Sequence, residues 1–286
     1  MSATTAATGQ SDFDLIRRKE LAGFLRARRD ATPSPMPRPH RRRAPGLLRE
    51  EVAAAAGIST TWYVWLEQAR PVRVSARTLD GLARALHLDV AERDYLARLA
   101  RPGRSDPVAA PSGSAGEGLA ALVQSLPHPA YVLDRVWNVV AWNAPAAALF
   151  GGFGAGRPTN LLVRLFLDPG WRALFVDWAD VARSATFQFR AATAELSGDP
   201  RREAVVAGLT ESSEAFAAWW AQPEVAAPAV WEKRLDHPGI GRLRMAYATY
   251  RPEGGDEHAR LVIYRPADEG SAAALDGVCG RIIPAG

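Results

Sequence analysis

The sequence predicts two domains, an all-α N-terminal domain and an α+β C-terminal domain with a five-stranded antiparallel sheet. Three observations lead to this prediction. The 286 residues exceed the roughly 250 residues beyond which a single hydrophobic core stops growing. Up to residue 100, apolar residues recur at the spacing typical of helices. In several segments beyond residue 130, apolar and polar residues alternate as they do in strands.

The composition is that of an ordinary globular protein, with 48% hydrophobic and 23% charged residues. No segment approaches the roughly 20 consecutive apolar residues that span a bilayer, and residues 1–10 do not have the pattern of a secretory signal. We therefore expect a cytoplasmic protein that has no membrane partner. The single cysteine, Cys279, excludes a disulfide within the chain and leaves any metal site without paired thiolates. No metal site and no required cofactor are expected.

The N-terminal domain, residues 12–101, is expected to contain five short helices. Their apolar periodicity predicts Leu15–Arg29, Leu48–Ala56, Thr60–Gln68, Arg77–Leu86 and Ala91–Ala100. The segment Thr32–Pro45 contains five prolines, which exclude a regular helix, and the cluster Arg41, Arg42 and Arg43, so we expect a basic arm on the surface. Residues 102–118 are rich in Pro, Gly and Ser and predict a linker.

The C-terminal domain, residues 119–270, begins with a predicted hairpin and continues with helices and a three-stranded meander. The hairpin strands are Tyr131–Leu133 and Val136–Trp142, joined at Asp134–Arg135. Helical spacing predicts one long helix over Pro169–Leu196, and two more at Arg202–Leu209 and Glu214–Ala221. The meander strands are Val230–Leu235, Leu243–Tyr250 and Leu261–Tyr264. We expect the helices to pack on one face of a sheet that folds around a concavity, with residues 271–286 as a C-terminal tail.

The segment Arg49–Gln68 has the pattern of a helix-turn-helix motif. Gly57 permits a sharp left-handed turn, and Ser59 is suited to cap the following helix. Small alanines before Gly57 let the two helices cross closely, while Tyr63 and Leu66 are expected to face inward. This leaves Thr60, Thr61, Trp62 and Trp65 pointing outward, where a recognition helix meets the major groove. The alternative is an αα-corner that never contacts DNA.

The charge is distributed unequally along the chain. Residues 12–104 contain 19 basic and 11 acidic residues, a net charge of +8, whereas the remainder has 16 and 20, a net charge of −4. A basic domain favours a polyanionic partner because neutralising phosphates releases counterions. Together with the motif, this charge predicts double-stranded DNA as a partner, although charge alone is equally consistent with a solvated surface.

These segments together resemble the Xre-type (lambda-repressor-like) helix-turn-helix transcription regulators with an MmyB-like C-terminal ligand-binding domain. The similarity is carried by RRRAPGLLREEVAAAAGIS (41–59), YVWLEQAR (63–70), TLDGLARALHLDVAERDYLARLA (78–100), LDRVWNVVAWNAPAAALFG (133–151), LFLDP (165–169) and KRLDHPGIGRLRMAYATY (233–250). The resemblance implies a PAS-like C-terminal fold that holds a fatty-acid-like ligand between sheet and helices.

The resemblance also implies DNA contacts. Arg49 should contact backbone phosphate, the start of the recognition helix should face base edges or phosphate, and Arg70 and Arg73 should lie where the chain passes the backbone. With the arginine arm, the candidate DNA-binding residues are Arg41, Arg42, Arg43, Arg49, Ser59, Thr60, Thr61, Trp62, Trp65, Arg70 and Arg73. Two residues depart from the family pattern. Ala69 replaces a usual Gly, which predicts mild strain. Trp65 replaces a polar residue, and either packs on a thymine methyl or sugar or is buried against Leu47 or Leu48.

Aromatic residues are abundant beyond the linker, where seven of the nine tryptophans lie. Most such rings simply fill a core, but they can also line an apolar pocket. The candidate ligand-binding residues are Trp137, Trp142, Asn143, Phe150, Leu162, Phe166, Trp171, Phe175, Trp178, Phe189 and Trp220. For Asn143, a role as the cap of a helix that begins near Ala144 is equally consistent with the sequence.

The sequence therefore predicts a sequence-specific transcription regulator whose C-terminal domain senses a small apolar ligand such as a fatty acid. We expect a homodimer on an operator whose half-sites lie about one helical turn apart. An enzyme is not expected, because the five histidines form no metal-ligand spacing and no nucleophile motif is present. Two alternatives remain open, a C-terminal domain that only mediates oligomerisation or protein contacts, and a PAS-like enzyme tethered to DNA.

Overall fold

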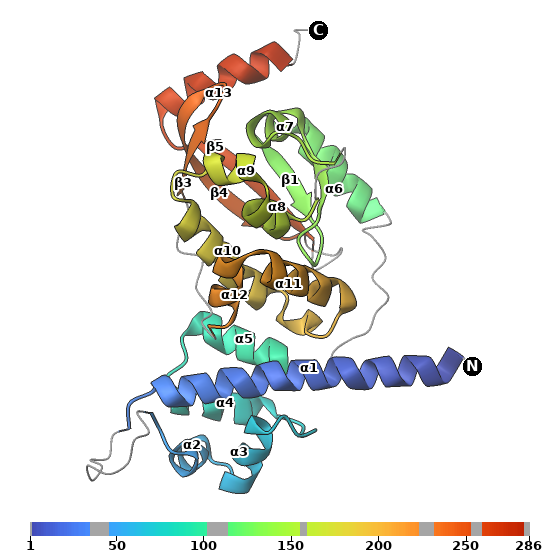
Figure 1. Ribbon diagram of the computed structural model, residues 1–286, viewed down its shortest axis with the longest axis vertical. Coiled ribbons are helices and arrows are strands. Elements are labelled where there is room, and N and C mark those ends of the chain that lie inside the picture. Colours follow the sequence, from blue (N-terminus) through green and yellow to red (C-terminus); the bar gives the residue numbers. More distant parts are fainter. Residues whose placement is uncertain are drawn as a thin grey trace. The chain divides into compact units, whose positions relative to one another are not determined.

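The computed structural model describes residues 2–34, 46–101, 114–154, 159–222, 232–252 and 259–282. The chain divides into two compact units (Figure 1). The first comprises Met1–Asp106, Arg190–Ala204 and Ala221–Ala227, and the second comprises Pro107–Phe189, Val205–Trp220 and Pro228–Gly286. The division is consistent with two domains, whereas the exact boundaries of the predicted domains stay a prediction.

The first unit contains the five predicted helices, with ends that differ by one or two residues except at the start of the first helix. They are α1 (Ser2–Ala31), α2 (Arg49–Ala56), α3 (Thr60–Glu67), α4 (Ala76–Ala85) and α5 (Val90–Ala100). Their apolar faces form one cluster around Leu25, Val52, Tyr63, Leu82 and Leu96, each at most 3% exposed. Burial of such side chains stabilises the unit by about 2 kcal/mol for each large residue.

Side-chain caps define where these helices begin. The hydroxyl of Ser59 accepts a hydrogen bond from the Trp62 backbone N–H at 3.2 Å, and that of Ser75 caps α4 in the same way. Asp89 and Glu92 form a capping box at the start of α5. Each cap satisfies backbone N–H groups that have no partner within the helix and contributes about 1 kcal/mol.

The first unit also contains a buried polar cluster around Glu20 of α1. This carboxylate accepts hydrogen bonds from the Tyr95 hydroxyl at 2.7 Å and from the Arg202 guanidinium at 2.9 and 3.0 Å. Burial alone would raise the pKa of Glu20, but the charge of Arg202 and the hydrogen bonds from Ser197 and Tyr95 outweigh it and lower that pKa. The carboxylate therefore stays ionised inside the unit.

The second unit is built on a five-stranded antiparallel sheet in the order β2-β1-β5-β4-β3. Its strands are β1 (Ala130–Leu133), β2 (Val139–Trp142), β3 (Glu232–His237), β4 (Gly241–Tyr250) and β5 (Arg260–Pro266). The predicted number of strands and the hairpin and meander arrangement are confirmed. Strand β2 begins three residues later than predicted, because Trp137 has a left-handed φ of 68° and the Asp134 carboxylate accepts from the N–H groups of Val136 and Asn138 to close a turn.

Helices cover both faces of this sheet, so the expectation of one covered face was wrong. The remaining elements are α6 (Ser114–Ser125), α7 (Ala144–Phe150), α8 (Leu161–Leu167), α9 (Pro169–Leu174), α10 (Trp178–Ala192), the 3-10 helix η1 (Ala194–Leu196), α11 (Pro200–Ser212), α12 (Glu214–Trp220) and α13 (Glu269–Ile282). Val123 of α6 packs with Ala130, Val132 and Leu261 on one face. Since side chains alternate along a strand, Tyr131 and Val262 point to the other face, where α8, α9 and α10 lie (Figure 1).

Three predictions of regular structure need correction. The long helix over Pro169–Leu196 is interrupted, because Phe175 forms a bridge with Leu235 and the Val176 N–H donates to the Arg234 carbonyl of β3 at 3.0 Å. The predicted linker ends in helix α6, which begins at Ser114, and the predicted tail contains most of α13. The arginine arm Arg41–Arg43 lies outside the described residues. No helix in the described ranges is long and apolar enough to cross a membrane.

Candidate DNA interface and ligand pocket

The predicted helix-turn-helix is formed by α2, a tight turn and α3. Gly57 ends α2 with a left-handed φ of 71°, and Ile58 packs against the core of the unit. The crossing of α2 with α4 is close, since a Cβ on Gly81 would lie 2.5 Å from the Ala56 carbonyl oxygen. Only glycine fits at this helix contact. The close packing of α2 on α4 helps to hold the helix-turn-helix in place.

The outer side of α3 carries most of the predicted recognition residues. Thr60 and Thr61 are exposed in the first turn, next to the capping residue Ser59, which is exposed as well. Trp62 differs from the prediction, because it is partly buried and packs against the hydrophobic cluster of the unit. The start of α3 thus offers hydroxyl groups at the surface, which can donate to and accept from base edges or phosphates.

Trp65 and the residues after α3 form the other side of this surface. Trp65 is 38% exposed and the Arg70 guanidinium lies 5.8 Å from its ring centroid, so the ring is not buried against Leu47 or Leu48. Ala69 has a left-handed φ of 57°, as expected where the family pattern has Gly. Arg70 and Arg73 are both exposed beyond the helix end, so their cations face solvent.

Arg49 is held at the start of α2 by a buried carboxylate. Glu67 Oε2 accepts from Arg49 Nε at 2.6 Å, and its Oε1 accepts from Arg29 Nε at 2.7 Å. Burial alone would raise the pKa of Glu67, but the hydrogen bonds and charges of the two arginines outweigh it and lower the pKa. The Arg49 side chain stays 49% exposed, so its terminal amino groups remain available to a phosphate.

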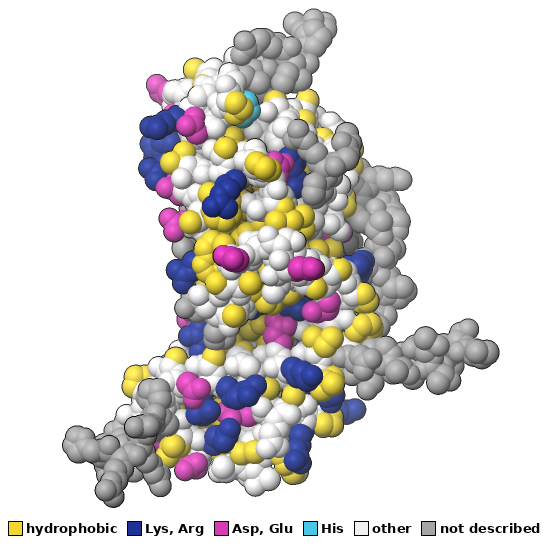
Figure 2. Space-filling view, viewed as in Figure 1, with side chains coloured by type: hydrophobic (Ala, Val, Ile, Leu, Met, Phe, Trp, Pro, Cys, Tyr) yellow, Lys and Arg dark blue, Asp and Glu magenta, His cyan; other side chains and the backbone are white. Residues whose placement is uncertain are grey.

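The surface of the helical unit is basic overall but not uniform. Figure 2 shows Lys and Arg side chains spread among acidic ones over the face that it displays. Several acidic residues neutralise neighbours in pairs, such as Asp94 with Arg98 at 2.8 Å. The interface with a polyanion is therefore expected to depend on particular arginines rather than on one broad positive patch.

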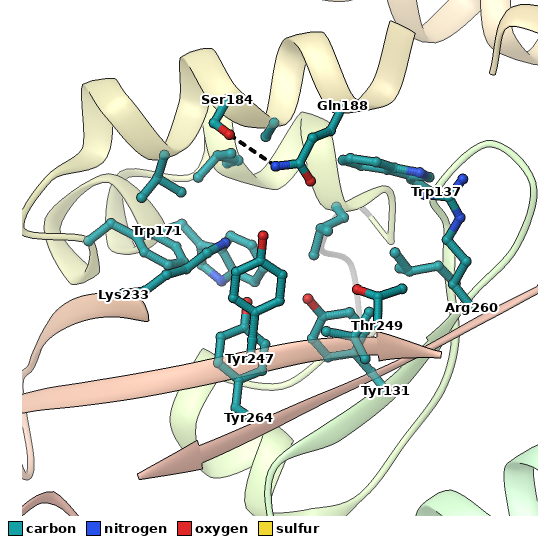
Figure 3. A pocket seen from close by; sticks show the side chains of 17 residues that line it. Tyr131, Trp137, Trp171, Ser184, Gln188, Lys233, Tyr247, Thr249, Arg260 and Tyr264 are labelled. Atoms are coloured by element: carbon teal, nitrogen blue, oxygen red, sulfur yellow. Dashed lines mark hydrogen bonds between the residues drawn. The ribbon is translucent and has the colours of Figure 1, made fainter. Parts of the chain in front are cut away.

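The second unit contains a pocket between one face of the sheet and helices α8, α9 and α10 (Figure 3). Its empty volume is about 710 Å³, which includes space at the mouth that is open to solvent. Most of the lining is aromatic or aliphatic, and the polar groups are few. The lining residues are Tyr131, Leu133, Trp137, Leu161, Leu165, Trp171, Phe175, Val181, Ser184, Ala185, Gln188, Lys233, Tyr247, Thr249, Arg260, Val262 and Tyr264.

The polar groups are placed around the pocket by both layers. Figure 3 shows Ser184 and Gln188 reaching from α10 toward the tyrosines that rise from the sheet, and the amide of Gln188 donates to the Ser184 hydroxyl at 2.9 Å. Burial raises the pKa values of Tyr131, Tyr247 and Tyr264, so the three phenols stay neutral. Burial lowers the pKa of the Lys233 ammonium to about 8.

Three of the eleven predicted ligand-binding residues line this pocket, namely Trp137, Trp171 and Phe175. The other eight lie outside the lining and have structural contacts instead. Asn143 caps α7 and also bonds to the backbone at positions 126, 128 and 130. Trp142 packs on Phe153, Phe150 on Trp171, Phe166 on Phe216, Trp178 on Trp219, and Phe189 and Trp220 on each other, while Leu162 is fully buried.

The polar part of the lining was missed by reasoning from the sequence. Lys233 and Leu235 lie two positions apart in β3, so they point to the same face, and Leu235 is fully buried. This alternation is the signal that could have identified Lys233 as an inward lysine. Tyr131 and Tyr264 fall on the inner face by the same rule. No group of three or more metal-ligating His, Cys, Asp or Glu side chains occurs within the described part of the chain.

Comparison with known families agrees with the two kinds of domain. Residues 115–277 match the model of the MmyB-like transcription regulator ligand binding domain, and residues 20–96 match a helix-turn-helix domain. No protein with a curated description matches the chain significantly. The first match covers more than half of the chain and contains every residue of the pocket lining. The chain therefore belongs to the MmyB-like transcription regulators, in which an N-terminal helix-turn-helix domain that binds DNA is followed by a ligand-binding domain.

Proposed function

We propose that this regulator controls transcription in response to a small, mostly apolar organic ligand, of which a fatty acid is the type that the family resemblance suggests. The observation that supports this proposal most is the pocket, whose aromatic and aliphatic lining is broken by only a few polar groups. A long hydrocarbon chain gains from burial in such a lining, and the polar groups orient it. We propose binding and release of this ligand, rather than catalysis, as the activity of the domain.

On the DNA side, we propose that the exposed residues around α3 read the operator and that Arg49, Arg70 and Arg73 contact its phosphates. The exposure of Thr60 and Thr61 supports the first part, and the free terminal amino groups of Arg49 support the second. We propose that a homodimer binds two half-sites about one helical turn apart.

Helix α10 is suited to communicate ligand binding. Its residues Ser184 and Gln188 line the pocket, and from Arg190 onward the same chain segment belongs to the first unit, where Arg202 bonds with Glu20. If α10 can adopt two arrangements, a ligand that binds one arrangement more tightly than the other would shift the population of DNA-binding states.

Fluorescence anisotropy with the DNA upstream of the protein's own gene tests the DNA part. We expect Thr61→Glu to weaken binding at least tenfold, because the new carboxylate meets the negative charge of DNA. Thr210→Glu, a matched change at an exposed position of α11, should bind as the unchanged protein does. Equal binding of all three proteins would contradict the proposed interface.

Native mass spectrometry of the purified protein, with denatured samples as the control, tests the ligand part. We expect an additional mass that is lost on denaturation and a lower occupancy in Ala185→Trp, which fills the pocket from α10. If neither a retained molecule nor binding of added lipids is found, the second domain is better explained as an oligomerisation module.

A further inference from the structure

We propose that the ligand of this pocket is an organic acid whose anionic group binds the ammonium of Lys233. The inference rests on the proposed ligand-sensing function and specifies the chemistry that the pocket selects. It assigns a polar end to a site whose walls are otherwise mostly apolar. It also predicts which end of an amphiphilic molecule enters beside β3.

The surroundings of Lys233 carry the argument. Its Nζ lies 4.5 Å from the ring centroid of Tyr247, 5.5 Å from that of Phe175 and 5.9 Å from that of Tyr264. Among the described residues, no hydrogen bond or ion pair reaches this ammonium. The faces of the three rings attract the cation, but they offer no oxygen acceptor for a hydrogen bond from its three N–H donors. An acceptor that bears negative charge is what this end of the pocket lacks.

Acidic side chains in the described part of the chain do not supply that charge. None of them lines the pocket, and the titratable or charged groups that do are Tyr131, Tyr247, Tyr264, Lys233 and Arg260. Glu232 precedes Lys233 in β3, yet the alternation of the strand turns it to the other face, where it accepts from Arg244 at 2.7 Å. Lys233 is half-buried in the pocket lining. A partly buried cation without a counter-ion is costly, so a ligand carboxylate would be bound in preference to a neutral group.

The opposite side of the pocket supports the same chemistry. Figure 3 shows Lys233 on one side and Trp137 with Arg260 on the other. The Trp137 side chain is buried, its Nε1 has no hydrogen-bond partner, and the residue adopts a left-handed φ of 68° that L-residues rarely take. The indole N–H is a hydrogen-bond donor, as is the Lys233 ammonium. Residues with donor groups therefore line both sides of the pocket, and no acidic side chain of the described residues lines it.

Arg260 is the second cation of the lining and provides the matched control. Its guanidinium lies 6.0 Å from the Trp137 ring centroid, on the far side from Lys233. A carboxylate placed at Arg260 would require the ligand to enter in the reverse orientation. Changing each cation separately thus distinguishes the two orientations.

The test uses isothermal titration calorimetry on the full chain at pH 7. It compares acids with alcohols that have a similar hydrocarbon skeleton. One pair is dodecanoate and 1-dodecanol, kept below the concentration at which they aggregate, and the other is 2-naphthoate and 2-naphthalenemethanol. We expect each acid to bind at least tenfold more tightly than its alcohol. In Lys233→Met this preference should fall below threefold, while the alcohols still bind; in Arg260→Met it should persist.

The outcomes separate this inference from the function on which it rests. If acids and alcohols bind equally well to the unchanged protein, the anionic site is wrong and the apolar pocket remains. If the preference is lost in Arg260→Met and kept in Lys233→Met, the headgroup lies at the other side and the assignment is overturned. If neither pair binds, the ligand-sensing function fails together with the inference. Where a variant does not fold, the comparison on the unchanged protein still decides whether the pocket has an anionic site.

Discussion

At the scale of single residues, Glu67 connects the stability of the helical unit with its DNA surface. We expect Glu67→Gln to lower the free energy of unfolding by about 2 kcal/mol, because the buried neutral side chain no longer pairs with Arg29, which keeps the exposed Asp30, or with the half-exposed Arg49. Urea unfolding followed by circular dichroism measures this change. Asp94→Asn, which removes an exposed pair with Arg98, is the control and should change stability by less than about 0.5 kcal/mol.

The same carboxylate predicts a dependence of stability on pH. The pKa of Glu67 is lowered in the folded state, so its contribution is present above the unfolded value of about 4.3 and is lost as the pH falls through the folded pKa. Between pH 5 and pH 3, the unchanged protein should therefore lose more stability than Glu67→Gln. Parallel pH profiles of the two proteins would show that the ion pairs do not contribute.

Lys233 predicts how ligand affinity depends on pH. Its pKa is about 8 in the free protein, and a bound anion would raise it. Above pH 8, binding of dodecanoate must then take up a proton, so the Kd should rise up to about tenfold per pH unit. The phenols of the pocket stay neutral and Arg260 stays charged over this range. Titrations between pH 7 and pH 9.5 measure the effect; 1-dodecanol should show none, and a flat profile for the acid would argue against Lys233.

At the scale of elements, the ends of α3 and α4 contain left-handed residues that are not glycine. Ala69 follows α3 with a φ of 57°, and His87 follows α4 with a φ of 51°. We expect Ala69→Gly to raise the free energy of unfolding by up to about 1 kcal/mol, because glycine adopts this conformation without steric cost. Chemical denaturation measures the gain.

The control for this change is the opposite substitution at the neighbouring helix end. Gly57 has a φ of 71°, and a Cβ added there would meet no side chain or distant backbone atom within 4 Å, so Gly57→Ala tests conformation alone. It should destabilise the unit by about 1 kcal/mol or more. If Ala69→Gly destabilises as well, the strain at the end of α3 is offset by contacts that the substitution removes.

At the scale of the whole molecule, ligand and operator must affect each other equally. If ligand changes the affinity for DNA by some factor, saturating DNA must change the affinity for ligand by the same factor. We expect a factor of about 5 to 150, the range of most allosteric proteins. Paired titrations of dodecanoate with and without operator DNA, and of operator with and without dodecanoate, measure it. Unequal factors would reveal that more than these two sites take part.

The sequence predicted the helix-turn-helix almost completely, because its signals are local. The left-handed turn at Gly57, the cap at Ser59 and the inward Tyr63 and Leu66 follow from residues within one short segment. The number of strands and their order along the chain were also predictable, since alternation belongs to each strand by itself, whereas several strand ends differ from the prediction. The break between α9 and α10 was not, because it is made by hydrogen bonds from Val176 and a bridge from Phe175 to the distant strand β3.

The pocket, in contrast, was decided by the tertiary structure. Aromatic residues in the sequence indicated a ligand-binding core, but only pairing in the sheet distinguishes the rings that line the cavity from those that fill the core. Tyr131 pairs with Val262 and Tyr247 with Tyr264, which aligns side chains more than a hundred residues apart on one face. The same register turns Lys233 inward. The sequence by itself thus determined a DNA-binding fold and a sensor-like domain, whereas long-range strand pairing determined which groups the sensor presents to its ligand.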